Sequence, residues 1–204
     1  VAASTEDGGF IRVPTAEECT FTKGAAYVHI TSNNTIKGTQ FHQFPEVDAP
    51  LIADMSSDIL WRKFDASKFS MIYAGAQKNL GPSGVTVIVI RKDFVETAND
   101  GIPTMLSYKT HLKKNSLFNT PPCFPIYMVN KTLNWIKGQG GLEVVEANNR
   151  KKGDLLYNTI DSNPDFFRAP VEKASRSYMN VVFRLPTEEL EAALHPHELP
   201  ESDR

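Results

Sequence analysis

Residues 85–90 (VTVIVI) restrict the possible folds more than any other segment of the chain. The run is apolar on both faces apart from Thr86, whereas a strand with one face in water alternates apolar and polar residues. Such a strand is typical of a sheet covered on both sides, so we expect an α/β fold in which helices flank a mostly parallel sheet. The run is far too short to cross a bilayer, which takes about 20 apolar residues.

Shorter apolar runs predict further strands. Residues 25–30 (AAYVHI), 49–53 (APLIA) and 71–74 (MIYA) are each bounded by turn-forming residues. We expect the last two to be buried strands beside the first one described, and His29 to be a packed core residue. The alternating stretch 179–185 (MNVVFRL) predicts a later, half-buried strand.

Helical periodicity dominates the second half of the chain. Apolar residues at helical spacing predict a helix over 126–136, which Gly138 would end. A longer helix is predicted over 141–160, and residues 187–194 begin another. Residues 195–204 (HPHELPESDR) have two prolines and no periodicity, which predicts a loose, exposed tail.

The predicted helix over 141–160 is a natural connector between two domains. The sequence after it offers one strand and a short helix, which is too little for a hydrophobic core. We therefore predict a larger domain over 1–140 and, over 141–204, a connecting helix with an incomplete second domain.

Charge and cysteine content limit the partners and the compartment. The net charge is −2, so no overall field attracts nucleic acid or an anionic membrane, and neither is expected as a partner. Cys19 and Cys123 lie far apart without metal-ligand spacing, and no secretion signal opens the chain. We expect reduced thiols, a cytoplasmic location and no metal site.

Residues 73–84 (YAGAQKNLGPSG) carry the first candidate for chemistry, Lys78. This lysine follows one apolar strand and precedes another, among small residues that let a bulky group approach the backbone. An enclosed position there would favour the neutral amine that nucleophilic chemistry needs. The alternative on spacing alone is a surface lysine in a turn.

Asp54 is the second candidate, because it ends the strand predicted over 49–53. Functional groups of α/β proteins gather at the carboxyl ends of parallel strands. A carboxylate there can pair with the protonated ring nitrogen of a cofactor and keep the ring electron-poor. The alternative is a helix N-cap, a position that aspartate also fills well.

Three motifs occur in a fixed order: IADMSS at 52–57, IYAGAQKNLGPSGVTVIVI at 72–90 and SLFNTPPCF at 116–124. In wording and spacing the chain resembles the phosphoserine aminotransferase family of class-V, fold-type-I pyridoxal-phosphate enzymes, from about Val1 to Leu185. The resemblance implies the second half of the large domain of that fold, with a truncated small α+β domain after it.

The resemblance also implies the site residues. Lys78 matches the lysine that holds pyridoxal 5'-phosphate, and Asp54 matches the partner of the pyridine nitrogen. Gln77 matches a phosphate-binding side chain, and Thr35 matches a threonine that contacts the cofactor.

The resemblance also implies that two residues act in a neighbouring subunit. Asn119 and Thr120 match residues that reach the cofactor phosphate of the neighbouring subunit, since the family forms homodimers with shared active sites. A turn that leads into a helix is a second reading of this segment, and both readings can hold together.

The implied reaction transfers an amino group from L-glutamate to 3-phosphohydroxypyruvate, giving O-phospho-L-serine and 2-oxoglutarate. A related phosphorylated oxo acid of vitamin B6 synthesis is implied as a second substrate. The family's upstream phosphate-cupping arginine and its downstream carboxylate-binding arginine have no counterpart motif here. The alternatives are therefore a non-catalytic fragment that binds partner chains, or another fold-type-I enzyme such as a cysteine desulfurase.

Overall fold

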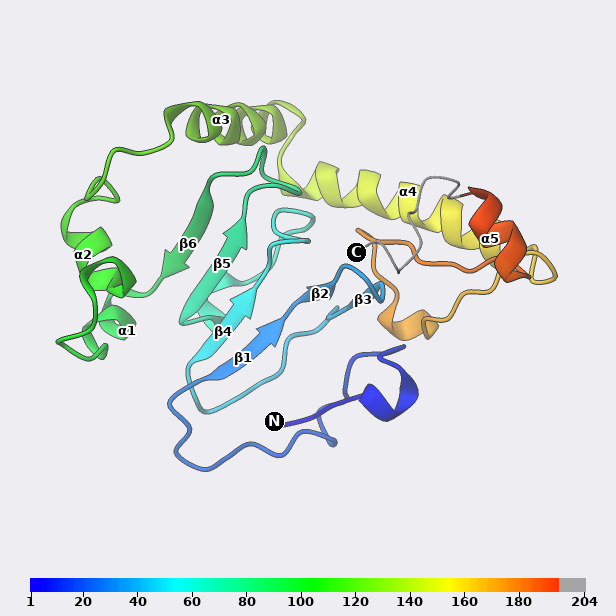
Figure 1. Ribbon diagram of the computed structural model, residues 1–204, viewed down its shortest axis with the longest axis horizontal. Coiled ribbons are helices and arrows are strands. Elements are labelled where there is room, and N and C mark those ends of the chain that lie inside the picture. Colours follow the sequence, from blue (N-terminus) through cyan, green and yellow to red (C-terminus); the bar gives the residue numbers. More distant parts are fainter. Residues whose placement is uncertain (195–204) are drawn as a thin grey trace.

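A four-stranded sheet forms from the apolar runs described above, in a computed structural model that describes residues 1–194 (Figure 1). Its strands are β1 (Val28–Thr31), β4 (Leu51–Asp54), β5 (Met71–Gly75) and β6 (Thr86–Ile90), in the order β1-β4-β5-β6. The pairs β1–β4 and β4–β5 are parallel and β5–β6 is antiparallel. The predicted α/β fold with a mostly parallel sheet is confirmed.

The two faces of the sheet are covered to different extents. Leu51, Ala53, Ile72 and Ala74 point to one face and are buried in the main hydrophobic core, together with Val129 from the helix α3 (Cys123–Gly138). Burying apolar area of this kind contributes about 25 cal/mol per Å². Most side chains of β1, β4 and β5 on the opposite face are exposed or half-buried.

The expectation that residues 85–90 are covered on both sides is wrong for the described residues. The strand β6 lies at the edge of the sheet, where Ile88 is 37% and Val89 54% exposed. An uninterrupted apolar run indicates what a strand is able to bury, but it does not show that neighbouring elements cover it.

The helices follow the sheet in sequence. The short helices α1 (Lys92–Glu96) and α2 (Tyr108–Lys113) come directly after β6, and α3 and α4 (Leu142–Asp161) pass along one side of the molecule (Figure 1). The predicted helices over 126–136 and 141–160 are confirmed, although α3 begins earlier, at Cys123. Pro125 is compatible with this because a proline in the first helical turn displaces no intrahelical hydrogen bond.

A small hairpin leaves the carboxyl end of β1. It consists of β2 (Asn33–Asn34) and β3 (Thr39–Gln40), which pair antiparallel. The Asn34 side chain closes the turn by accepting hydrogen bonds from the backbone N–H groups of Ile36 and Lys37. Gly38 has φ +71°, and a Cβ there would lie 2.7 Å from the Val182 side chain, so only glycine fits without a shift.

The segment after α4 contains less regular structure than predicted. Residues 179–185 do not form a strand, and only Arg184 makes an isolated bridge, with Arg168. Alternating apolar residues need a partner strand to become a sheet, and the described part of the chain offers them none. The predicted helix over 187–194 is confirmed as α5 (Glu188–Leu194), and the predicted loose tail lies outside the described residues.

Four 3₁₀ turns complete the element order: Glu6–Gly8, Ala66–Lys68, Thr104–Leu106 and Lys173–Ser175. Within residues 1–194, no helix combines the length and the apolar character that a membrane span requires.

Candidate functional site

The carboxyl ends of β4 and β5 bring the sequence-predicted residues toward one edge of the sheet. Because the two strands are parallel, Asp54 at the end of β4 lies in register with Tyr73 of β5, and Lys78 follows β5 by a short turn. The Lys78 Nζ donates a hydrogen bond of 2.6 Å to the hydroxyl oxygen of Thr35. Thr35 sits in the turn of the β2–β3 hairpin, so the hairpin positions a partner for the lysine amine.

Asp54 is held by the loop that follows it. One of its carboxylate oxygens accepts a 2.8 Å hydrogen bond from the backbone N–H of Ser56. The Ser56 hydroxyl in turn accepts a 3.0 Å hydrogen bond from the backbone N–H of Gly75, which ties this loop to the end of β5. The alternative reading of Asp54 as a helix N-cap is wrong, because a turn and not a helix follows it.

The turn that carries Gln77 and Lys78 leaves both side chains exposed. The Gln77 side chain folds back so closely that a Cβ on Gly75 would lie 2.5 Å from its amide oxygen. Glycine at position 75 is therefore what allows Gln77 to fold back over the end of β5. The expectation that Lys78 is enclosed is wrong for the described residues.

Tyr73 and His29 are neighbours of the site that sequence reasoning missed. The His29 ring stacks on Tyr73 with centroids 5.9 Å apart, and its Nε2 lies 3.0 Å from the Tyr73 hydroxyl. Burial, and then the nearby Asp54 carboxylate, raise the pKa of Tyr73. The predicted core position of His29 is wrong, since this side chain is exposed.

A buried polar network anchors the hairpin that carries Thr35. The Asp58 carboxylate is 4% exposed and accepts hydrogen bonds from the Ser32 hydroxyl and, at 3.0 Å, from the Gln40 amide. The side chains of Ser32 and Gln40 are fully buried on either side of the hairpin. Burial raises the pKa of Asp58 even though both hydrogen bonds oppose that shift. No cation forms an ion pair with it among the described residues.

A second set of buried hydrogen bonds joins the same hairpin to the segment after α4. The Asn33 amide donates to the Ser57 hydroxyl at 2.9 Å and to the Asn180 side-chain oxygen at 2.7 Å. Ser177, which is fully buried, donates from its hydroxyl to Asn33. The turn that presents Thr35 to Lys78 is thus fixed from two directions.

Asn119 and Thr120 lie elsewhere, in the connection between α2 and α3. Both are exposed, and the Asn119 amide lies 3.4 Å from the Met105 sulfur. No hydrogen bond among the described residues joins them to Thr35, Asp54 or Lys78. The structure therefore brings Thr35, Asp54, Gln77 and Lys78 to one edge and leaves the Asn119–Thr120 pair outside that group.

Comparison with known proteins places this arrangement in a family. The family model "Aminotransferase class-V" matches residues 2–195. Phosphoserine aminotransferases of Geobacillus kaustophilus and Desulfatibacillum aliphaticivorans are 54% and 56% identical to the chain. The alignments cover 93% and 95% of this chain but 53% of either relative, so the chain spans about half the length of the curated relatives it matches.

Solved structures agree with the sequence comparison. The phosphoserine aminotransferase of Bacillus circulans subsp. alkalophilus superposes with a TM-score of 0.93 at 53% identity, over 96% of this chain and 55% of that one. A phosphoserine aminotransferase with bound pyridoxal phosphate from Trichomonas vaginalis has a TM-score of 0.83 at 39% identity, over 89% and 52% of the two chains. From its sequence and its fold, the chain belongs to the class-V aminotransferase family.

Proposed function

We propose that this chain carries the pyridoxal 5'-phosphate site of a phosphoserine aminotransferase. The reaction would transfer an amino group between L-glutamate and 3-phosphohydroxypyruvate. The observation that carries the proposal is the 2.6 Å contact between Lys78 and Thr35 at the sheet edge where β4 ends in Asp54. The identity of more than half of the aligned residues with phosphoserine aminotransferases supports this choice of substrates over those of other class-V enzymes.

The side chains at this edge suit a phosphorylated pyridine. The Gln77 amide is a hydrogen-bond donor that a phosphate dianion can use, and the Lys78 amine beside Thr35 can condense with an aldehyde. Asp54 supplies an anionic acceptor, and its half-exposed carboxylate uses one oxygen for Ser56. The exposure of Gln77 and Lys78 leaves room for a ligand next to the backbone of the turn.

Each residue would then have a distinct task. Pyridoxal phosphate supplies, when bound, an aldehyde that condenses with amines and a ring that withdraws electrons. Lys78 would hold the cofactor through its amine and, once released by the substrate amine, would move a proton at the substrate Cα. Asp54 would keep a proton on the ring nitrogen, and Thr35 would orient the Lys78 amine through their hydrogen bond.

The proposal includes the assembly and the compartment. Asn119 and Thr120 are exposed and outside the Lys78 group, which suits residues that contact the cofactor phosphate of a second subunit. We therefore propose a cytoplasmic homodimer with shared active sites. Mixing chains that carry either Lys78→Ala or Asn119→Ala tests this, because one intact site should re-form in the mixed dimer and restore part of the cofactor binding.

Covalent capture of the cofactor tests the site itself. The chain is incubated with pyridoxal phosphate, reduced with borohydride, digested and mapped by mass spectrometry. We expect a visible absorbance band before reduction and a label on Lys78 afterwards. Lys78→Ala should lose both, whereas Lys37→Ala, which removes an exposed lysine of the β2–β3 hairpin, should lose neither. A label on a different lysine in the unmodified chain would refute this site.

A second candidate function is a fragment that binds partner chains without catalysis. Large exposed apolar side chains favour it, among them Val89 (54%), Phe124 (68%) and Trp135 (60%). The same incubation separates the two candidates, since such a fragment would give neither the absorbance band nor a specific lysine label.

A further inference from the structure

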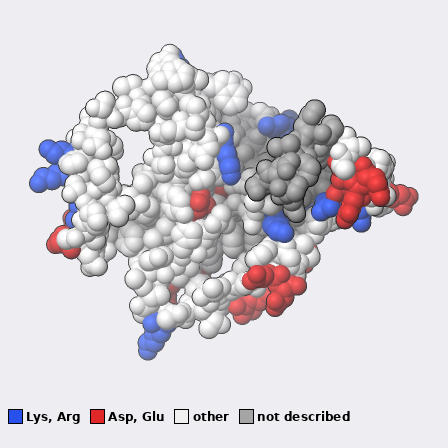
Figure 2. Space-filling model, in the orientation of Figure 1, with Lys and Arg blue, Asp and Glu red and all other residues white. Residues whose placement is uncertain are grey.

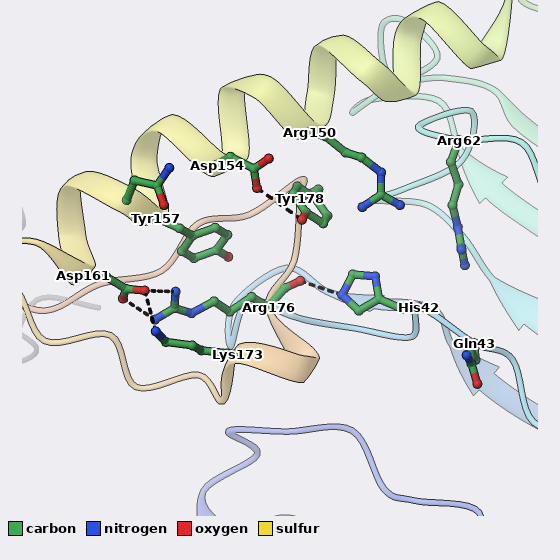
Figure 3. A pocket seen from close by; sticks show the side chains of 11 residues that line it. His42, Gln43, Arg62, Arg150, Asp154, Tyr157, Asp161, Lys173, Arg176 and Tyr178 are labelled. Carbon is green, nitrogen blue, oxygen red and sulfur yellow. Dashed lines mark hydrogen bonds and ion pairs between the residues drawn. The ribbon is translucent and has the colours of Figure 1, made fainter.

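A cavity of about 470 Å³ lies beneath α4, away from the residues proposed to hold the cofactor (Figure 3). Its walls come from α4, from His42 and Gln43 after β3, from Arg62 in the segment after β4, and from residues 173–178. None of Thr35, Asp54, Gln77 or Lys78 lines it. The volume falls within the range of about 300–1,000 Å³ that is usual for small-molecule sites.

The cavity has an excess of positive charge. Arg62, Arg150, Lys173 and Arg176 line it, against the carboxylates of Asp154 and Asp161. Asp161 is shared by two of these cations, with hydrogen bonds of 2.7 and 2.9 Å to Arg176 and a contact of 3.1 Å to Lys173. The single carboxylate of Asp161 therefore faces two cations, and it does not neutralise the arginines at the other end of the cavity.

Arg62 forms no ion pair among the described residues, although the Glu146 and Asp58 carboxylates are near enough to attract its charge. Its only hydrogen bond goes from Nη2 to the backbone oxygen of Phe41, at 3.2 Å. Its Nε is buried and has no hydrogen-bond partner. The guanidinium also lies over the rings of Phe44 and Trp61, 5.2 and 5.1 Å from their centroids. A guanidinium that is partly removed from water, without an anion, is unfavourable unless a ligand supplies one.

Arg150 lies at the same end of the cavity and is held rigidly. It donates to Glu146 from Nε and Nη2 at 3.0 and 2.8 Å, and it stacks 4.8 Å from the centroid of the Tyr178 ring. Burial lowers the pKa of His42 on the opposite wall, and the charges of Arg62 and Arg150 act in the same direction.

We propose that this cavity binds a small molecule that carries a carboxylate or a phosphate group, with Arg62 as its main contact and Arg150 beside it. The planar fork of arginine matches either oxyanion in two parallel hydrogen bonds. Asp154, which accepts a 3.3 Å hydrogen bond from the Tyr178 hydroxyl, would repel an anion and so keep the oxyanion at the arginine end. The inference does not depend on the proposed transaminase function.

Titration of the full chain with inorganic phosphate, and separately with succinate, tests the proposal. Binding is followed at low salt by calorimetry and by the NMR signals of the arginine Nε–H groups. We expect saturable binding that shifts the Arg62 signal, and the tighter of the two probes identifies the preferred oxyanion. Arg62→Met should weaken binding by about tenfold or more, as loss of a charged hydrogen bond does.

Lys63→Met is the matched control, since it removes the same charge from the next residue, which pairs with Glu143 and does not line the cavity. It should leave the affinity within about twofold. Equal losses in Arg62→Met and Lys63→Met, or no saturable binding by the folded chain, would overturn the proposal.

Two further variants keep the outcome clear. If Arg62→Met fails to fold, Arg62→Lys carries the test, because it keeps the charge but loses the fork and should still weaken binding several-fold. Lys78→Ala should bind both probes as the unmodified chain does. Loss of binding in Lys78→Ala would instead assign the phosphate to the proposed cofactor site and refute the cavity.

Discussion

Substitution of Asp58 tests whether the polar network beneath the β2–β3 hairpin determines the stability of the fold. Asp58→Ala removes the acceptor of the Gln40 amide, which is fully buried and has no solvent to turn to. The Ser32 hydroxyl keeps a hydrogen-bond acceptor in this variant, because it also lies 3.0 Å from the backbone oxygen of Asp54. Asp58→Asn keeps the shape and an acceptor for Gln40 while removing the charge.

The comparison between the two variants isolates the hydrogen bond. Both remove the buried carboxylate, so the free energy of its desolvation cancels between them. A buried amide donor without a partner costs about 1–3 kcal/mol, and the small void left by alanine adds to this. We therefore expect Asp58→Ala to be about 2–4 kcal/mol less stable to unfolding than Asp58→Asn.

The pH dependence has a definite sign. Burial raises the pKa of Asp58 in the folded state above its ordinary value, so the folded chain holds this proton more tightly than the unfolded chain. The stability gained from this tighter proton binding is complete below the unfolded pKa of about 3.9. It is lost as pH rises through the higher pKa of the folded state. Asp58→Asn should thus match or exceed the unmodified chain at neutral pH and lose this advantage in acid.

Urea unfolding followed by tryptophan fluorescence measures these differences. Trp61 is 2% exposed and reports the core, whereas Trp135 is 60% exposed and changes little. Equal stabilities of Asp58→Ala and Asp58→Asn would refute the role assigned to the Gln40 hydrogen bond. A large loss in Asp58→Asn at neutral pH would show that the charge itself stabilises the fold.

Two further predictions concern α4. Gly153→Ala should destabilise the chain by about 1–3 kcal/mol in the same urea assay, because the added Cβ would lie 2.6 Å from the Tyr178 ring. Gly138→Ala in α3 is the control. Its added Cβ would meet open space, so this variant should be neutral or stabilising by up to about 1 kcal/mol. Hydrogen bonds from Arg176 and Lys173 lower the pKa of Asp161 to about 2, so the stability it contributes should be lost as pH falls from about 4 toward 2. Asp161→Asn should abolish that part of the acid dependence of thermal unfolding, and an unchanged acid profile would contradict the ion pairing.

The parallel part of the sheet could be predicted from sequence because short segments of the chain are enough to identify its strands. The runs that became β4 and β5 are short, apolar and bounded by turns, and each strand needs only a neighbour of the same kind. Residues 179–185 show the limit of this reasoning. Their alternation is as clear as that of any strand, yet pairing depends on a partner elsewhere in the chain, which no local pattern reveals.

The sequence suggests candidate residues for the site, but it does not show how they lie relative to one another. Asp54 and Lys78 stand out because each follows an apolar run, where α/β folds place functional groups. The contact between Lys78 and Thr35 depends on the path of the hairpin, which is fixed by Asp58, Gln40 and their buried partners. The sequence reading assigned no role to Asp58, because a single carboxylate within a polar stretch does not reveal that it will be buried.

The arginines beneath α4 escaped prediction for a related reason. Positions 62, 150 and 176 are far apart in sequence, and each reads alone as an ordinary surface charge. Only folding brings these three positive charges to one cavity. Figure 2 shows that acidic and basic side chains occur in a few small groups on the face in view, most of which is formed by other residues.

The position of β6 at the sheet edge has a consequence for how the chain behaves at high concentration. Within residues 1–194 this strand pairs only with β5, so the backbone N–H and C=O groups along its other side are open to an added strand. No proline or charged residue interrupts Thr86–Ile90, and such segments are the usual starting points of ordered aggregation. We expect residues 1–194 to associate through this edge at high concentration, and a lysine in place of the exposed Val89 to reduce that association.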